Sequence, residues 1–240
     1  MNSVARLALA LLPFATLACS NNDIIPFDPN TEAQIRFIHA VPEGPNLDLL
    51  IEGAAAARNV AFDQAVGYFI IAAGQRSVSA RESAVGEEGT PGPTVFTLTP
   101  TLTAGTFYTI IATGAPTAVQ TIELVDNPAK PAAGNWNLRL VNAAPNLAAI
   151  DIYITEPNVD LHTVSPTIAN VAYGGGSNYV TLPVLSAGQV IRITNAGDKD
   201  TPLIVSTERT FVSQQVSTIF VLGNPNGAPF ALFLADGTGQ

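Results

Sequence analysis

The sequence predicts an all-β protein built from two tandem antiparallel β-sandwiches, each immunoglobulin-like or transthyretin-like. Apolar residues make up 47% of the 240 residues and charged residues only 12%, against about 25% charged in ordinary soluble domains. A large folded core is therefore expected. The 19 Gly and 18 Pro supply many turns, which favours short strands. One pattern of residues also occurs twice along the chain, and this indicates two copies of one domain.

The first 18 residues are typical of a signal peptide. Arg6 precedes an apolar run that ends at Ala18, directly before Cys19. The run is shorter than the roughly 20 residues that span a bilayer, so no transmembrane helix is expected. The sequence around Ala18 and Cys19 resembles the bacterial lipobox. We therefore expect cleavage before Cys19, and acylation, for example by palmitate, of the only cysteine in the chain.

Residues 19–32 are polar and contain two prolines, which predicts a tether between the lipid and the folded part. More than one acyl chain, at about 0.8 kcal/mol per buried CH₂, holds a protein firmly to a membrane. Ser20 follows the cysteine, where an Asp would indicate retention at the inner membrane. We therefore expect an exported lipoprotein of the bacterial outer membrane, facing the periplasm or the cell surface.

Two stretches of the chain match residue by residue. Residues 36–42, followed by Asp48, align with residues 139–145, followed by Asp151. Each copy also contains Asn-Val-Ala followed by an aromatic residue, and each ends on an apolar strand closed by Asp126 or Asp236. We therefore predict one domain over residues 33–128, a linker over 129–135 and a second domain over 136–240.

Within each copy, short Val-, Ile- and Thr-rich segments are separated by Gly, Pro or Asn, which is typical of a sandwich, with a closed barrel as the alternative. No helix is expected. In the first copy we expect strands at 33–40, 46–52, 58–62, 66–72, 75–81, 94–99, 106–113 and 118–125. In the second copy we expect them at 136–143, 149–155, 168–173, 177–183, 189–195, 203–211, 216–223 and 228–235. Apolar alternation in the first strand predicts half-buried sheets.

The repeated openings, the Asp six positions after each proline, the Asn-Val-Ala segment and the strand at 106–114 resemble the bacterial envelope proteins grouped as domain of unknown function 4397. The resemblance covers nearly the whole mature chain. It implies exported lipoproteins with one or two copies of the domain, and it implies no activity.

Arg36 and Asp48 flank a Pro-Gly turn, and Arg139 and Asp151 repeat the arrangement. We expect each pair to form a structural ion pair across a hairpin, which fixes strand register while adding little net stability. The alternative is that each arginine binds an anionic ligand in an open cleft.

Metal sites are not expected. His39 aligns with Asn142, so that position calls for a hydrogen-bonding side chain and not for a base. His162 lies in an insertion, and with 2 His and 1 Cys in the chain the usual zinc ligands are too few. The acidic pairs, such as Asp198 with Asp200, lack the spacing of a calcium loop and predict solvated turns. No cofactor is expected.

Trp136 opens the second copy where the first has Ala33. The simpler interpretation is that it packs against the interdomain linker. The alternative is a sugar-stacking platform formed by Trp136 with Tyr153 or Tyr179, which requires these rings to be exposed.

The net charge of −9 argues against nucleic-acid and anionic-membrane partners. No nucleophile motif of the Gly-x-Ser-x-Gly or Ser-x-x-Lys type is present, so no enzyme activity is expected. We predict a non-catalytic, lipid-anchored envelope protein with a structural, adhesive or protein-binding role. The alternatives are a glycan-binding lipoprotein and an envelope hydrolase.

Overall fold

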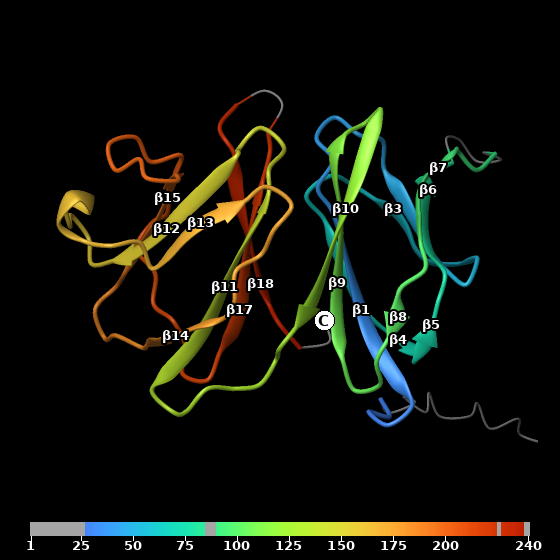
Figure 1. The fold of residues 1–240 in the computed structure, drawn as a ribbon, viewed down its shortest axis with the longest axis horizontal. Helices are drawn as coiled ribbons and strands as arrows, with labels where there is room; N and C mark the ends of the chain where they lie inside the picture. Colours follow the sequence, from blue (N-terminus) through green and yellow to red (C-terminus); the bar gives the residue numbers. More distant parts are fainter. Residues whose placement is uncertain (1–26, 85–89, 225–226, 238–240) are drawn as a thin grey trace, which may run out of the picture.

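A computed structural model describes residues 27–84, 90–224 and 227–237. The expected signal peptide, Cys19 and most of the expected tether lie outside these residues. The described part is almost entirely β-structure, arranged as sheets packed face to face (Figure 1). This confirms the all-β sandwich fold and not the closed barrel. None of the described residues forms a helix long and apolar enough to cross a membrane.

The first sandwich contains two four-stranded sheets. Its inner sheet has the order β10 (Ala118–Asp126), β9 (Phe107–Ala115), β1 (Glu32–His39) and β4 (Ala65–Ala72). Its outer sheet has the order β3 (Ala54–Val60), β2 (Leu47–Ile51), β6 (Val78–Glu82) and β7 (Thr94–Leu98). A small ribbon of β5 (Gly74–Gln75) and β8 (Thr101–Leu102) closes one end.

The second sandwich repeats this plan. Its inner sheet has the order β14 (Val180–Pro183), β11 (Asn135–Ala143), β17 (Val216–Leu222) and β18 (Phe230–Ala235). Its outer sheet has the order β13 (Ile168–Ala172), β12 (Ala149–Thr155), β15 (Val190–Asn195) and β16 (Ile204–Val205).

The expectation of purely antiparallel sheets is wrong at one place in each copy. β1 pairs in parallel with β9, and β11 pairs in parallel with β17. Parallel neighbours need a long connection. The chain provides this connection by forming strands of the opposite sheet after the first strand and before its parallel partner. The first strand of each copy therefore lies beside a strand from late in the same copy.

Most of the expected strands occur, and 149–155 agrees with β12 to the residue. The strand expected over 203–211 is reduced to β16, because the chain leaves the sheet after Val205 and places Phe211 against Trp136. One 3₁₀ turn, η1 (Leu161–Thr163), was not expected. It lies in the insertion of the second copy, where the Asp160 side chain accepts a hydrogen bond from the His162 N–H.

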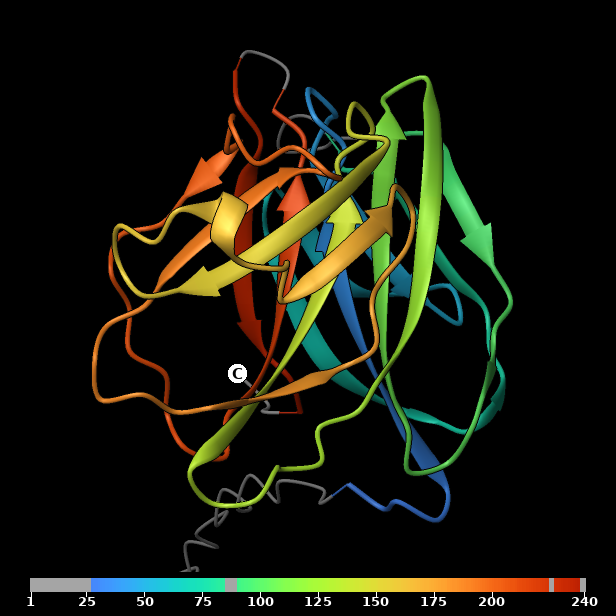
Figure 2. The same ribbon diagram turned by 60° about the vertical axis from the view of Figure 1, so that its left-hand side comes forward.

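The two inner sheets pack against each other, so the molecule has four β-layers (Figures 1 and 2). Each sandwich has its own core, and a third apolar cluster lies between the inner sheets. The third cluster comprises Ile38, Ala40, Ile111 and Ile122 from the first copy with Val141, Ala143, Phe220 and Leu222 from the second. The expectation of half-buried sheets is therefore wrong for the central strands of the inner sheets, whereas the edge strands β10 and β14 still have exposed residues. Every residue of β17 is buried, because one of its faces meets the core of its own sandwich and the other meets the first copy.

Candidate functional site

A network of charged and hydroxyl side chains lies inside the interface between the two inner sheets. Arg36 on β1 and Arg139 on β11 are each only 3% exposed. Both point away from their own core and towards the other copy. The Arg36 Nη2 donates a hydrogen bond to Asp236 Oδ1 at 2.7 Å, and Arg139 makes a short ion pair with Asp126. Each arginine is therefore neutralised by an aspartate of the other sandwich.

The sheet that carries each aspartate also holds it in place. Asp126 accepts hydrogen bonds from the Thr109 hydroxyl at 2.6 Å and from the Tyr68 hydroxyl at 2.7 Å. Asp236 accepts the equivalent bonds from Thr218 at 2.6 Å and Tyr179 at 2.8 Å, in the second copy. The carboxylates thus enter the interface already oriented.

The same arrangement occurs in both halves. The Arg36 Nη1 donates to the carbonyl of Ala235 at 3.1 Å, and the Arg139 Nη1 donates to the carbonyl of Val125 at 3.0 Å. Each guanidinium also lies over the tyrosine ring of its own copy, Tyr68 or Tyr179, at 4.9 and 4.8 Å. The interface therefore has an approximate two-fold relation, with the two aspartates exchanged.

Burial and the charge of Asp126 raise the pKa of Tyr68 far above its usual value. Burial and Asp236 do the same to Tyr179. Burial by itself lowers the pKa of Arg139, but Asp126, Tyr179 and Asp236 together outweigh it, and the pKa is raised. Both tyrosines are thus held as neutral hydrogen-bond donors and Arg139 as a cation. This protonation pattern suits a fixed structural network rather than proton transfer near neutral pH.

The predicted hairpin pairs Arg36 with Asp48 and Arg139 with Asp151 are wrong. β1 and β2 belong to different sheets, as do β11 and β12, so each connection crosses the sandwich. Asp48 instead lies 3.4 Å from Arg81 and 3.5 Å from Arg58. The alternative of an anion held by Arg36 or Arg139 in an open cleft also fails, because both arginines are buried and paired.

The two repeated aspartates outside the interface support a tight turn. Asp48 Oδ1 accepts the Asn59 N–H at 3.0 Å, and Asp151 Oδ1 accepts the Asn170 N–H at 2.7 Å. Asn59 and Asn170 both have left-handed backbones, with φ of 54° and 56°, which Asn tolerates better than most residues. Burial by itself raises the pKa of Asp48, but hydrogen bonds and Arg81 outweigh it and lower that pKa. The repeated Asn-Val-Ala motif is thus part of this turn.

His39 has the hydrogen-bonding role that the sequence predicts. Its Nε2 lies 2.9 Å from the carbonyl of Pro45, and its Nδ1 accepts the Val41 N–H at 3.3 Å. Asn142 Oδ1 accepts the equivalent bond from the Ala144 N–H at 3.2 Å. Burial lowers the pKa of His39, so the ring is neutral at pH 7.

The second histidine lies on the surface. His162 Nε2 is 3.0 Å from Asp200 Oδ1, with both side chains more than half exposed. Within the described residues, no group of three or more His, Cys, Asp or Glu side chains could hold a metal ion.

Trp136, Tyr153 and Tyr179 do not form the exposed platform considered for a glycan. Trp136 is 1% exposed and Tyr153 is 0% exposed, and the Tyr179 hydroxyl is bonded to Asp236. The Trp136 ring instead stacks on Phe211, with ring centroids 3.8 Å apart. The simpler expectation, that Trp136 packs, is right, although its partner is the segment after β16 rather than the linker.

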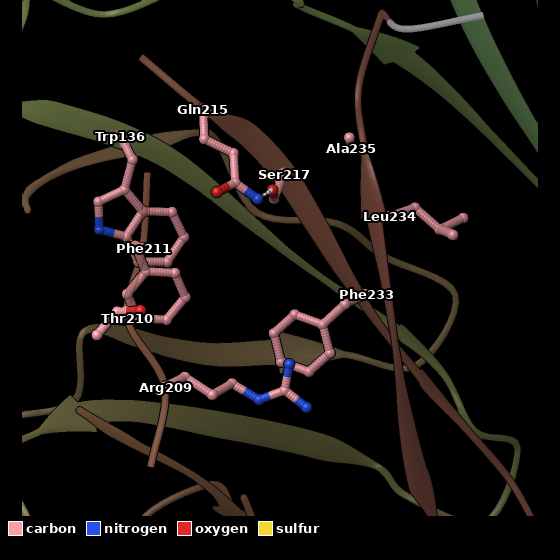
Figure 3. Close-up of a pocket in the computed structure, with 9 residues that line it drawn as sticks. All are labelled: Trp136, Arg209, Thr210, Phe211, Gln215, Ser217, Phe233, Leu234 and Ala235. Carbon is pink, nitrogen blue, oxygen red and sulfur yellow. Dashed lines mark hydrogen bonds between the residues drawn. The ribbon is translucent and has the colours of Figure 1, made fainter. Parts of the chain in front are cut away.

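Beside this stack lies a hollow of about 250 Å³, open to solvent at one end of the second sandwich. Figure 3 shows Trp136 and Phe211 on one side of it, Leu234 and Ala235 on the other, and Arg209 beneath Phe233. Sequence reasoning missed Arg209 and Phe211, because residues 203–211 read as a strand. A comparison of the two copies could have indicated this stack. The first copy has no aromatic residue at the positions of Trp136 and Phe211.

These features define a class, an all-β protein of two sandwiches joined into one body by exchanged ion pairs. The family model described as "Domain of unknown function (DUF4397)" matches residues 33–153, just over half of the chain. The protein belongs to this family, as the sequence motifs indicated. No curated protein matches it.

Two solved structures show weak similarity. One is a carbohydrate-binding module of family CBM26 from Eubacterium rectale Amy13K, in complex with maltoheptaose. It is 9% identical, with a TM-score of 0.27, and the match covers 87% of this chain and 100% of that one. The other is a candidate cell-adhesion protein from Bacteroides fragilis. It is 8% identical, with a TM-score of 0.24, and the match covers 86% and 99% of the two chains. Likeness at this level says nothing about ligand or partner.

Proposed function

We propose that this protein is a non-catalytic, lipid-anchored module of the bacterial cell envelope, with a structural, adhesive or protein-binding role. The observation that carries the proposal is the exchanged ion-pair network. The network consists of two buried ion pairs, Arg36 with Asp236 and Arg139 with Asp126. In each pair the arginine and the aspartate belong to different sandwiches. These charges hold two domains in one orientation, which is what a rigid display module requires.

The positions of the chain ends support an anchored arrangement. β1, β9, β11 and β17 all run in the same direction, away from the end where the first described residues and the linker lie (Figures 1 and 2). A lipid on Cys19 would therefore hold this end towards the membrane. The loops that follow the four strands would then point away from it.

These outward loops come together across the two copies. Pro42 and Pro145, the prolines of the repeated motif, line a shared groove with Gly223 and Asn224. A neighbouring hollow of about 210 Å³ adds Glu43 and Pro116 to the same two prolines. The motif residues of both copies thus form one continuous surface, which is suited to contact with a partner.

The anchor is tested by metabolic labelling with radioactive palmitate in a Gram-negative host. The full chain should be labelled and should fractionate with the outer membrane, whereas Cys19→Ser should be unlabelled and released. A Cys19→Ser protein that is still labelled and retained would refute the anchor.

The binding role is tested by a photo-crosslinking amino acid placed at Glu43, on the outward groove, in cells that carry the anchored protein. The same amino acid at Lys130, in the linker, is the matched control. We expect one defined envelope protein to be crosslinked from position 43 and not from position 130. Equal patterns from both positions, or none from either, would contradict the proposed role of this surface.

A further inference from the structure

We propose that the hollow in the second sandwich binds the ring of a carboxylated sugar, a uronate, with Arg209 holding the carboxylate. This inference deepens the proposed function, since it rests on the protein being a binding module. The hollow is a different surface from the groove lined by Pro42 and Pro145.

The size of the hollow fits one sugar ring. Its volume of about 250 Å³ falls just below the roughly 300–1,000 Å³ typical of sites for drug-sized ligands. Phe211 and Phe233 supply apolar wall, against which the C–H groups of a pyranose can pack.

Arg209 supplies a positive charge that no acidic side chain neutralises within the described ranges. Its backbone is fixed by two hydrogen bonds with Gln189, each of 2.8 Å. Its guanidinium lies 4.5 Å from the centre of the Phe233 ring, and the residue is exposed. By contrast, Arg36, Arg58, Arg81 and Arg139 make ion pairs with aspartates. The Arg76 and Arg192 guanidinium groups donate instead to backbone carbonyls or to a threonine hydroxyl. A planar guanidinium with free N–H groups matches the two oxygens of a carboxylate.

The neighbouring acid is directed elsewhere. The Glu208 side chain covers Gly188 so closely that a Cβ at that position would overlap its carboxylate. Glu208 is not among the residues that line the hollow. The Arg209 guanidinium therefore makes no ion pair with Glu208 and can pair with a ligand carboxylate, even though the whole protein carries a net charge of −9.

Hydroxyl and amide groups complete the lining. Thr210 and Ser217 offer hydroxyls, and Gln215 offers its side-chain carbonyl, which also accepts the Val212 N–H at 3.3 Å. The Gln215 Nε2 donates to Ser217 Oγ at 2.8 Å, which fixes the amide and leaves the Ser217 proton free to donate. Donors and acceptors beside an apolar wall suit a ring with several hydroxyls better than a plain hydrocarbon acid.

The first sandwich acts as an internal comparison, because it has the same backbone without these side chains. Gln75 pairs with Thr101 there, as Gln189 pairs with Arg209 in the second copy. Thr101 thus occupies the position of Arg209. Two residues further on, Thr103 stands in place of Phe211. The site is therefore expected only in the second copy.

The test is a titration of the soluble chain beginning at Ser20, followed by the fluorescence of Trp136, the only tryptophan. Because Trp136 lines the hollow, occupancy should change its emission. The probes are the methyl glycosides of D-glucuronate and D-galacturonate, with those of D-glucose and D-galactose as neutral twins. We expect saturable binding of at least one uronate, and at least tenfold weaker binding of its neutral twin.

Arg209→Thr places the first-copy residue in the second copy, and it should weaken uronate binding at least tenfold while leaving the urea midpoint unchanged. Arg58→Thr, on an arginine that is also exposed, is the control and should bind like the parent. No saturable change with either uronate, equal affinity for the neutral twin, or full binding by Arg209→Thr would each overturn the inference. Displacement by acetate at the same concentration would also overturn it, because the ring would then contribute nothing. Crosslinking from position 43 does not depend on Arg209, so failure here is distinguishable from failure of the proposed function.

Discussion

Asp126→Asn should destabilise the sandwich that does not contain it. The substitution keeps the shape of the side chain but removes the charge that neutralises Arg139, which is 3% exposed. Removing one partner of a buried ion pair costs about 3–5 kcal/mol, because the other charge stays buried. Asp236 also raises the pKa of Arg139 and remains in place, so we expect a loss near the lower end, about 3 kcal/mol.

The assay is urea unfolding followed by Trp136, which lies in the second sandwich, whereas Asp126 lies in the first. Glu123→Gln, on the same strand but exposed, is the matched control and should change the free energy of unfolding by less than about 0.5 kcal/mol. Combining Asp126→Asn with Arg139→Met should cost at least about 1 kcal/mol less than the sum of the single changes. A loss under about 1 kcal/mol for Asp126→Asn alone would refute a coupled buried network.

Three further predictions concern single positions. His39 has its pKa lowered by burial, so the unfolded chain takes up a proton that the folded chain does not. Its contribution is complete above about pH 6.5 and falls at lower pH by at most about 1.4 kcal/mol per unit. His39→Asn introduces the residue of the second copy. It should therefore reduce the change of the urea midpoint with pH between about pH 7.5 and about pH 5.5, and an unchanged pH dependence would count against this role of His39. Gly114→Ala should cost at least about 1 kcal/mol, because φ is 92° and a Cβ would lie 2.6 Å from the Ala118 carbonyl; a neutral thermal melt would contradict this. Tyr68→Phe removes the 2.7 Å hydrogen bond to Asp126 and should lower the free energy of unfolding in urea by about 1–3 kcal/mol. A stabilised variant would show that the hydroxyl is not needed.

The sequence predicted the strands well, because in this chain apolar segments and turn residues alternate regularly and the two copies confirm each other. It failed at 203–211, where Val205 and Phe211 suit a strand but the chain turns to cover Trp136. Local preference cannot reveal that a neighbouring ring, absent from the first copy, attracts the segment.

The buried arginines were identified from the repeat, but their partners were not. The hairpin pairing assumed that residues close in sequence lie on paired strands, whereas a sandwich sends β2 to the opposite sheet. The true partners, Asp126 and Asp236, lie on the other copy, and their pairing depends on how two domains pack. Two features of the sequence indicate this packing of the two domains. Each repeat ends on an aspartate, and β1 has apolar residues on both of its faces.

Small-angle X-ray scattering from the soluble chain beginning at Ser20 tests most directly whether the two sandwiches form one body. Packed inner sheets predict a pair-distance distribution with a single maximum, unchanged by moderate salt because the ion pairs are buried. Two maxima, or a longest dimension that corresponds to two sandwiches joined end to end, would contradict the exchanged network and the rigid module built on it.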